Sequence, residues 1–454
     1  MTPNIHRWAS NWSWFKNGVR SQFVTYTAPN HMSIVTGLHE QDHGIVGNYF
    51  YETTTGKFYD YFNLTGKQGI VNASLDPSWY KAEPIWIANE KYDSSRRSAA
   101  FYWPNGDAPF PSPPHRPFFY KQWTTYGNLS DWMSDVDAIA DAFLSKKNPV
   151  NFVAWYVAEP DHTLHENGFY NADHGHAEID GPDNVMCIKD YVRSDGYKIG
   201  DHMIYPDNDE IGRELYHNIT SAVRTHGYKV NVFLKEDIPA RYFYSNSTRI
   251  GRIVIEPDIG WAASFTCTKK KLRETYAPGK RKYNSSAHGM DPDRKEMRAL
   301  LVVGGPSVVP RRQMLEVPDN IDLYPFMCYL LSIPASPNNS SFSIIRTALL
   351  EGGPRLTTRP FITSTETEDF PQHRDSDVFI FIVIASFCIV MILVVYTCRY
   401  SKLIEEPFWI WGQKGYRPLK TDLCTVERGR QDIVDSTSSM RKNTITDGWS
   451  EDEF

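Results

Sequence analysis

The sequence predicts an α/β domain followed by a single membrane-spanning helix. A helical pattern at residues 131–146 precedes a strand-like apolar run at 149–157, which is typical of α/β proteins. A second strand-like run, Ala299 to Val303, leads into Gly304-Gly305-Pro306. Residues 378–398 carry no charge and are numerous enough to cross a bilayer once as a helix. Because ligands bind beyond the C-terminal ends of strands in open α/β sheets, we expect functional residues there.

Composition narrows the class of protein. The chain has 454 residues, of which 41% are apolar and 14% aromatic, so it can bury a large core. A net charge of -6 offers no basic face for nucleic-acid backbones, and we exclude nucleic acid as the primary partner.

The flanks of the apolar run at 378–398 predict its orientation in the bilayer. Basic Arg399 and Lys402 follow the run, while acidic Asp375 and Asp377 precede it, so the positive-inside bias places the C-terminal side in the cytosol. A buried core helix is the alternative, but such a helix is rarely apolar on every face for so long. We therefore expect a single-pass type I protein of the cell membrane. Its parts are an extracellular domain at 1–350, a Pro/Thr/Glu-rich stalk at 351–377, the span at 378–398 and a cytoplasmic tail at 399–454.

Glycosylation sequons support this orientation, because every Asn-x-Ser/Thr sequence precedes the span and none follows it. The sequon residues are Asn11, Asn63, Asn72, Asn128, Asn218, Asn246, Asn284, Asn338 and Asn339.

Three cysteines fall in the predicted extracellular part, so at most one internal disulfide forms there. Cys328 lies in the apolar run Y-P-F-M-C-Y-L-L, which favours a buried free thiol. Cys187 and Cys267 are then the remaining pair.

Asp161 and His165 directly follow the strand predicted at 149–157. A carboxylate and an imidazole four residues apart share one helical face and can ligate a single metal ion. Exposed acid/histidine pairs at this spacing are also common, and that is the alternative interpretation. The position at a strand end favours the metal site.

Residues 27–48 hold the candidate nucleophile. Thr27 precedes a Pro-Asn-His turn and an apolar helical run, and Asn48 follows His43-Gly44 closely enough to face the same pocket. An alternative function for Thr27 is to cap a helix that begins near Pro29. The two functions are compatible.

Four segments together resemble the ecto-nucleotide pyrophosphatase/phosphodiesterases of the alkaline-phosphatase superfamily, in that family's own order. They are residues 27–48, E-P-D-H-T-L-H at 159–165, D-H-G-H at 173–176 and A-H-G-M-D at 287–291. The resemblance implies an alkaline-phosphatase-like central sheet flanked by helices and two bound Zn²⁺ ions. It implies that Thr27 attacks phosphorus and that Asn48 donates its amide to a phosphoryl oxygen.

The same resemblance implies the ligands of each ion. The first zinc would be held by Asp161, His165 and His288, and the second by Asp173, His174 and the Thr27 hydroxyl. His176 stands where the family has Met, and we predict that it is not a ligand. Tyr102 and Tyr126 match positions at which family members stack the nucleotide base, although each is also compatible with an ordinary core or rim aromatic residue.

The implied activity is hydrolysis of extracellular nucleotides or dinucleoside polyphosphates to nucleoside 5′-monophosphates through a phosphothreonine intermediate. Two alternatives stay open: a phosphodiesterase for choline lysophospholipids, and a catalytically impaired surface glycoprotein of the same fold.

Two departures from the family lead to expectations about this chain. The family begins with a signal peptide and a first strand that ends in a metal-binding Asp, whereas this sequence starts at a block that follows that Asp, M-T-P-N-I-H-R-W. Only residues 166–172 separate His165 from Asp173, where the family has a helix and a core strand. We therefore expect a domain that is incomplete at both places, with one zinc site stronger than the other and with little catalytic activity in this chain.

Overall fold

The computed structural model describes residues 3–62, 73–111, 115–122, 129–167, 176–179, 181–276 and 285–351. All of these belong to one of the two units into which the chain divides, Met1–Arg359 with Asp447–Phe454. Within them, no helix is long and apolar enough to span a membrane. The predicted span at 378–398 and the tail after it lie outside the described residues.

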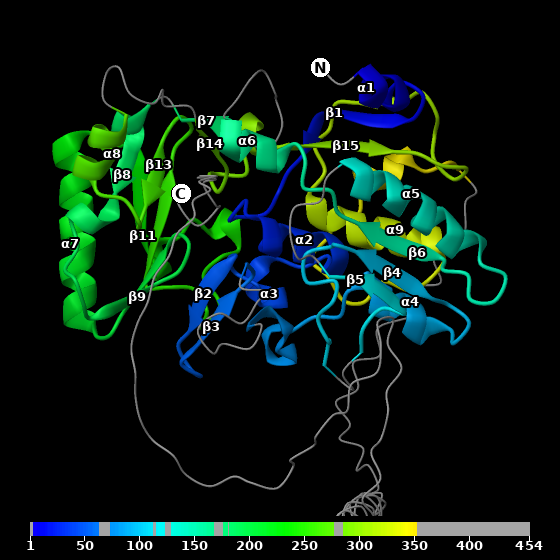
Figure 1. The fold of residues 1–454 in the computed structure, drawn as a ribbon, viewed down its shortest axis with the longest axis horizontal. Helices are drawn as coiled ribbons and strands as arrows, with labels where there is room; N and C mark the ends of the chain where they lie inside the picture. The colour runs from blue at the N-terminus through cyan, green and yellow to red at the C-terminus, as the bar shows by residue number, and fades with distance from the viewer. Residues whose placement is uncertain are drawn as a thin grey trace, which may run out of the picture. The chain divides into compact units, whose positions relative to one another are not determined.

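Helix α2 (Thr27–Thr36) contributes Ala28, Met32 and Val35 to a large hydrophobic core. It lies beside α9 (Leu323–Leu331), as Figure 1 shows. Its residues Ala28, Met32 and Val35, spaced three and four apart, are buried on one helical face. The helix ends at Gly37, which has a φ of 71°. A side chain there would also approach Tyr324 to 2.9 Å, so both conformation and space require glycine.

A parallel sheet lies on one side of α2, with strand order β5-β4-β6. Its strands are β4 (Ser98–Phe101), β5 (Phe119–Lys121) and β6 (Phe152–Trp155), and the helices beside it are α4 (Ile85–Tyr92) and α5 (Leu129–Leu144). Helix α5 and strand β6 confirm the helix predicted at 131–146 and the strand predicted at 149–157. The amphipathic α5 places Ala138, Ile139 and Ala142 against the sheet.

A second sheet has the order β15-β1-β16, from strands β1 (Ser13–Val19), β15 (Ala299–Val303) and β16 (Gln313–Met314). Strand β15 confirms the prediction for Ala299 to Val303, and it runs antiparallel to β1. Where the resemblance implied a central sheet, the described residues form this sheet and β5-β4-β6 as separate sheets. In that part of the chain β6 pairs only with β4, and residues 166–172 are too few for the extra helix and strand that the resemblance implied.

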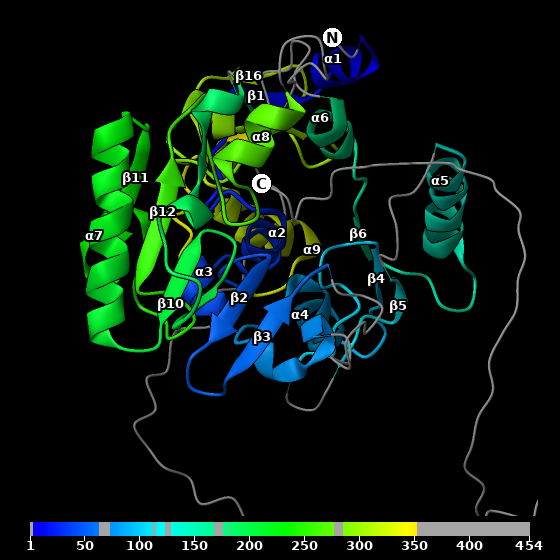
Figure 2. The ribbon, with the colours of Figure 1, turned by 60° about the vertical axis from the view of Figure 1, so that its left-hand side comes forward.

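On the other side of α2, an antiparallel sheet with order β11-β12-β10-β9 is covered by the long helix α7 (Asp209–His226), which is outermost in both Figure 1 and Figure 2. Asn208 caps α7 by accepting from the Ile211 N–H, and Gly227 ends it at a φ of 69°. The strands are β9 (Tyr197–Ile199), β10 (Met203–Pro206), β11 (Val230–Leu234) and β12 (Ile253–Pro257).

Shorter elements complete the described residues. They are α1 (Pro3–Ala9), α3 (Glu40–His43), β2 (Tyr49–Glu52) paired with β3 (Lys57–Asp60), α6 (Asp161–Asn167), β7 (Ala177–Glu178) paired with β14 (Ser286–Ala287), β8 (Val185–Cys187) paired with β13 (Ala262–Ser264), and α8 (Lys269–Thr275).

The cysteine predictions are confirmed. Cys187, at the end of β8, forms a disulfide with Cys267, three residues beyond the paired strand β13. Cys328 is a free thiol that is buried in α9.

Candidate active site

The candidate nucleophile Thr27 lies in the N-terminal turn of α2. Thr27 is the first helical residue, and Tyr26 before it occupies the capping position without a capping side-chain bond. The expectation that Thr27 caps a helix beginning near Pro29 is therefore wrong, because the helix starts two residues earlier. Instead, the Asn48 side chain reaches the helix end, where its Oδ1 accepts a hydrogen bond of 2.8 Å from the Ala28 N–H.

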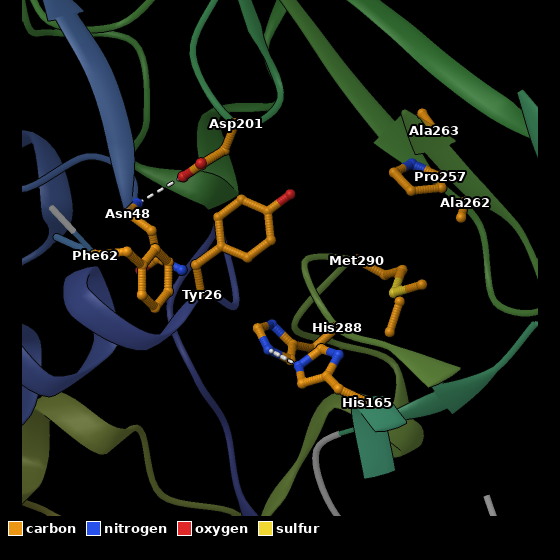
Figure 3. Close-up of a pocket in the computed structure, with 11 residues that line it drawn as sticks. Tyr26, Asn48, Phe62, His165, Asp201, Pro257, Ala262, Ala263, His288 and Met290 are labelled. Carbon is orange, nitrogen blue, oxygen red and sulfur yellow. Dashed lines mark hydrogen bonds between the residues drawn. The ribbon is translucent and has the colours of Figure 1, made fainter. Parts of the chain in front are cut away.

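Asn48 is held in place by a residue that the sequence interpretation missed. The Asp201 carboxylate accepts hydrogen bonds from the Asn48 N–H at 2.6 Å and from the Tyr49 N–H at 2.9 Å. Because Asn48 Oδ1 is bound to Ala28, its Nδ2 is the group left to act as a donor. Asn48 is buried, and it lines the same cavity as Asp201 (Figure 3).

Four side chains gather at α6 and the β7/β14 pair. Asp161, His165, His176 and His288 each offer one ligand atom, and all these atoms lie within 4.8 Å of one another. Asp161 and His165 come from one turn of α6, as their spacing predicted. The Asp161 Oδ1 lies 3.7 Å from both His165 Nε2 and His288 Nε2, and these two nitrogens lie 3.2 Å apart.

The β7/β14 ladder explains how residues so distant in sequence meet. Ala177 pairs with Ala287 in the antiparallel register. The next residues in that register, outside the ladder, are His176 and His288, and their ring centroids are 4.9 Å apart. His176, which we predicted is not a ligand, thus lies inside the cluster, with its Nε2 2.5 Å from Asp161 Oδ1.

The ionisation states of these side chains at neutral pH favour the binding of a cation. Burial lowers the pKa of His165 to about 4 and that of His288 to about 3, so both rings are neutral and carry a lone pair. Burial opposes ionisation of Asp161, but the hydrogen bond with His176 and the attraction of His288 and His165 hold its pKa well below the usual range. Three imidazoles and one carboxylate form a donor set that fits Zn²⁺.

One cavity joins the cluster to the nucleophile segment. Tyr26 and Asn48 line one side of it, and His165 and His288 line the other, as Figure 3 shows. The ring centroids of Tyr26 and His288 lie 5.7 Å apart. The cavity has a volume of about 50 Å³, which is room for a few atoms rather than for a whole nucleotide.

The other predicted site residues are placed as follows. Asp173, His174 and Tyr126 lie outside the described residues. Tyr102 directly follows β4, with a φ of 55°, and packs against the small core beneath α5. The Lys121 Nζ lies 5.8 Å from the centroid of its ring. Tyr102 is not among the residues that line the cavity, so its role in base stacking stays a prediction.

His31 is a further polar residue near the site that the sequence interpretation did not use. Its Nδ1 lies 2.7 Å from the Thr27 carbonyl oxygen, and its ring meets the edges of Trp103 and Tyr156, each at a centroid distance of 5.0 Å. Burial lowers the pKa of His31, and the Asp161 charge partly opposes this. Its spacing of four residues from Thr27 on a predicted helix was the available signal.

Comparison with known proteins gives a consistent result. The family model described as "Type I phosphodiesterase / nucleotide pyrophosphatase" matches residues 1–172 and 169–291. Bis(5′-adenosyl)-triphosphatase ENPP4 of Bos taurus is 29% identical over 374 residues, which cover 73% of this chain and 74% of that protein. Ectonucleotide pyrophosphatase/phosphodiesterase family member 5 of Homo sapiens is 24% identical over 443 residues, covering 87% of this chain and 85% of that protein.

Solved structures agree. The human ectonucleotide pyrophosphatase/phosphodiesterase 5 structure superimposes with a TM-score of 0.65 at 25% identity, covering 77% of this chain and 94% of that one. The structure of an inactive murine ectonucleotide pyrophosphatase/phosphodiesterase 5 in complex with AMP has a TM-score of 0.63 at 24% identity, covering 77% and 94%. The mixed α/β architecture described above is thus shared with these proteins.

Proposed function

The chain belongs to the type I phosphodiesterase/nucleotide pyrophosphatase family of hydrolases, and we propose that it hydrolyses phosphodiester and pyrophosphate bonds of nucleotides by a metal-dependent mechanism. The observation that carries the proposal is the shared cavity, where Tyr26 and Asn48 face His165 and His288. A phosphoryl group bound there would contact both the nucleophile segment and the metal-ligand cluster.

Thr27 is the proposed nucleophile. It follows Tyr26, which lines the cavity, and it begins α2, whose N-terminal end favours negative charge. Its hydroxyl oxygen would bond to phosphorus as the bond to the leaving oxygen breaks, while its proton passes to solvent. Water would then cleave the phosphothreonine ester, which restores the Thr27 hydroxyl and releases a nucleoside 5′-monophosphate.

Asn48 is the proposed stabiliser of the phosphoryl group. Its Oδ1 is fixed by the Ala28 N–H and its backbone by the Asp201 carboxylate, so its position is set before substrate arrives. The remaining Nδ2 would donate to a phosphoryl oxygen on which charge develops. Donors that are fixed in advance stabilise a transition state effectively, because they need no reorientation during the reaction.

Metal ions supply the remaining chemistry in this proposal. Bound divalent ions, taken to be two Zn²⁺, would hold the phosphoryl oxygens and lower the pKa of the Thr27 hydroxyl. Asp161, His165 and His288 would hold the first ion, supported by their convergence. Asp173, His174 and the Thr27 hydroxyl would hold the second, which is supported by the sequence resemblance.

Nucleotides and dinucleoside polyphosphates are the proposed substrates. Two relatives support this choice, since one is a bis(5′-adenosyl)-triphosphatase and the structure of another is a complex with AMP. Because the described cavity holds only a few atoms, we propose that the base lies beyond it. Tyr102 and Tyr126 are the proposed stacking partners.

We also propose that the domain is extracellular and is anchored through residues 378–398. The absence of charge in that run and the sequons before it support the proposal. Among the described sequon residues, Asn11, Asn246 and Asn339 are exposed, as glycosylation requires.

The test is a comparison of substrates with purified protein loaded with Zn²⁺. The proposal requires turnover of the nitrophenyl ester of TMP and of bis(5′-adenosyl) triphosphate above that of a Thr27→Ala variant, and none of lysophosphatidylcholine. Turnover of the lipid alone would replace the nucleotide proposal with the choline phosphodiesterase alternative. No turnover of any of the three, with zinc bound, would favour a non-catalytic surface protein.

A further inference from the structure

We infer that His176 is a fourth protein ligand of the first metal ion, which gives that ion a closed coordination shell. The inference rests on the metal site of the proposed function and changes its ligand count. Asp161, His165 and His288 alone would leave one position of a tetrahedral ion open, as hydrolytic zinc sites do.

The backbone register carries the first step of the argument. His176 and His288 are the residues next to the Ala177 and Ala287 pair of the β7/β14 ladder, so their side chains emerge side by side. The ring centroids of His176 and His165 are 4.7 Å apart, and His176 is 4% exposed. A histidine at this position cannot turn to solvent without leaving the packed cluster.

Hydrogen bonding decides which ring nitrogen of His176 carries the proton. The Ser286 hydroxyl donates its only proton to the Leu164 carbonyl at 2.9 Å. The same hydroxyl oxygen lies 3.3 Å from His176 Nδ1, so it accepts there and Nδ1 carries the hydrogen. Nε2 is then the ring nitrogen that faces Asp161 Oδ1.

His176 Nε2 and Asp161 Oδ1 lie 2.5 Å apart and share a hydrogen bond. A cation between the four side chains would take the place of the proton in that bond, and both atoms would bind it. In a tetrahedral zinc site with bonds of about 2.0–2.1 Å, ligand atoms lie roughly 3.3 Å apart. The distances of 3.2 Å between the His165 and His288 nitrogens, and 3.7 Å from each to Asp161, are close to that value.

A fourth ligand has consequences for the site. The donor set of three nitrogens and one oxygen has the ligand count of structural zinc sites, which bind the ion tightly and leave no open position. A phosphoryl oxygen reaches this ion only by a fifth bond or by displacing His176. Replacing His176 with Met would reopen the site.

The experiment compares His176→Met with the unchanged protein and with His162→Met, which removes a neighbouring histidine outside the cluster. Competition with a chromogenic chelator gives the zinc Kd of the tighter site. Loss of a residue that merely hydrogen-bonds to a metal ligand typically weakens metal affinity by about 10–100-fold. Loss of a direct ligand in His176→Met should therefore raise this Kd by about 100-fold or more, whereas His162→Met should leave it nearly unchanged. With one equivalent of Co²⁺, the unchanged protein should show the visible absorption of a four-coordinate ion. Inorganic phosphate should leave this spectrum unaltered, but it should change the spectrum of His176→Met.

Equal zinc affinity in the His176→Met and unchanged proteins would overturn the inference. So would a Co²⁺ spectrum of the unchanged protein that shifts with phosphate as much as that of the variant, because His176 would then act only by hydrogen-bonding Asp161. If none of the proteins bound zinc, both this inference and the metal dependence of the proposed function would fail. Zinc binding through three ligands would contradict the inference alone.

Discussion

Helix α2, which carries the proposed nucleophile Thr27, and the cluster of Asp161, His165, His176 and His288 border one cavity but are held in place by different means. In the helix, Asn30 of α2 joins neighbouring segments through neutral hydrogen bonds. Its Oδ1 accepts from the Gln22 N–H at 2.8 Å and from Asn320 Nδ2 at 2.9 Å, and its Nδ2 donates to the Val24 carbonyl at 2.8 Å. In the cluster, by contrast, imidazole nitrogens crowd one carboxylate.

The difference shows which region needs a ligand. Each polar atom of Asn30 has a partner of the opposite kind, so α2 can form without metal or substrate. The Nε2 atoms of His165 and His288 lie 3.2 Å apart, and each also lies 3.7 Å from the same Asp161 carboxylate oxygen. We therefore expect a preformed nucleophile helix beside a metal-dependent cluster, and each prediction below probes one of these two regions.

The largest expected effect comes from Thr27→Ala. If Thr27 is the nucleophile, its loss should lower turnover of nitrophenyl TMP by about 10⁴-fold or more, as in enzymes with covalent catalysis. The melting temperature should change little, because the Thr27 side chain is only partly buried. Thr27→Ser is the matched control and should keep part of the turnover. Near-normal rates in the alanine variant would exclude Thr27 as nucleophile.

Asp161→Asn should have the next largest effect, on metal binding. The change removes the only anionic ligand of the first site, so zinc affinity should fall by at least about 100-fold. Glu159→Gln is the control, since Glu159 begins the same segment but lies outside the cluster. A chelator competition measures both. Unchanged affinity in Asp161→Asn would mean that zinc binds elsewhere.

Removing the metal should affect the two regions unequally. Zinc present at 100 times its Kd stabilises the folded state by about 2.7 kcal/mol, which chelation would abolish. Hydrogen exchange should then accelerate at Ala177–Glu178 and Ser286–Ala287, while the amides of α2 stay protected. Equal acceleration in α2 would contradict a helix that forms without metal.

The smallest expected effect is on how the free energy of unfolding changes with acid pH, through His43, which packs against α2. His43 is fully buried with its Nε2 3.0 Å from the Ser33 hydroxyl, and burial lowers its pKa from 6.5 to about 3. The unfolded chain therefore binds a proton that the folded chain does not, so this contribution to stability is lost as the pH falls from 6.5 towards 3. The slope is about 1.4 kcal/mol per pH unit.

Urea unfolding of His43→Gln at pH 7.5 and 5.5 checks this expectation. The variant should be less stable at pH 7.5 but lose less on acidification than the unchanged protein. His6→Gln, at an exposed histidine, is the control and should keep the original slope. The same slope in His43→Gln would assign the acid sensitivity to other groups.

Sequence reasoning reached some of these features and missed others for identifiable reasons. Asp161 and His165 were predictable because their spacing places them on one helical turn. His288 was inferred from resemblance alone, since 123 residues separate it from His165. His176 was set aside because it replaces a Met, and its place in the cluster depends on the register of β7 against β14.

The elements of the fold likewise divide into those that the sequence predicts and those that it does not. Local periodicity predicted α5, β6 and β15, whose apolar patterns are strong. The separation of the two three-stranded sheets was not predictable from any one segment, because pairing depends on which strands are neighbours in space. Asp201 was missed for a related reason, since it supports Asn48 from 153 residues away.

Anomalous diffraction at the zinc edge, from crystals of the zinc-loaded protein, tests the central claim most directly. The claim is that α6 and the β7/β14 pair build a metal site beside the nucleophile helix. It predicts an anomalous peak about 2.0–2.2 Å from ligand atoms of Asp161, His165 and His288. A zinc peak elsewhere, with these three side chains turned away from one another, would contradict it.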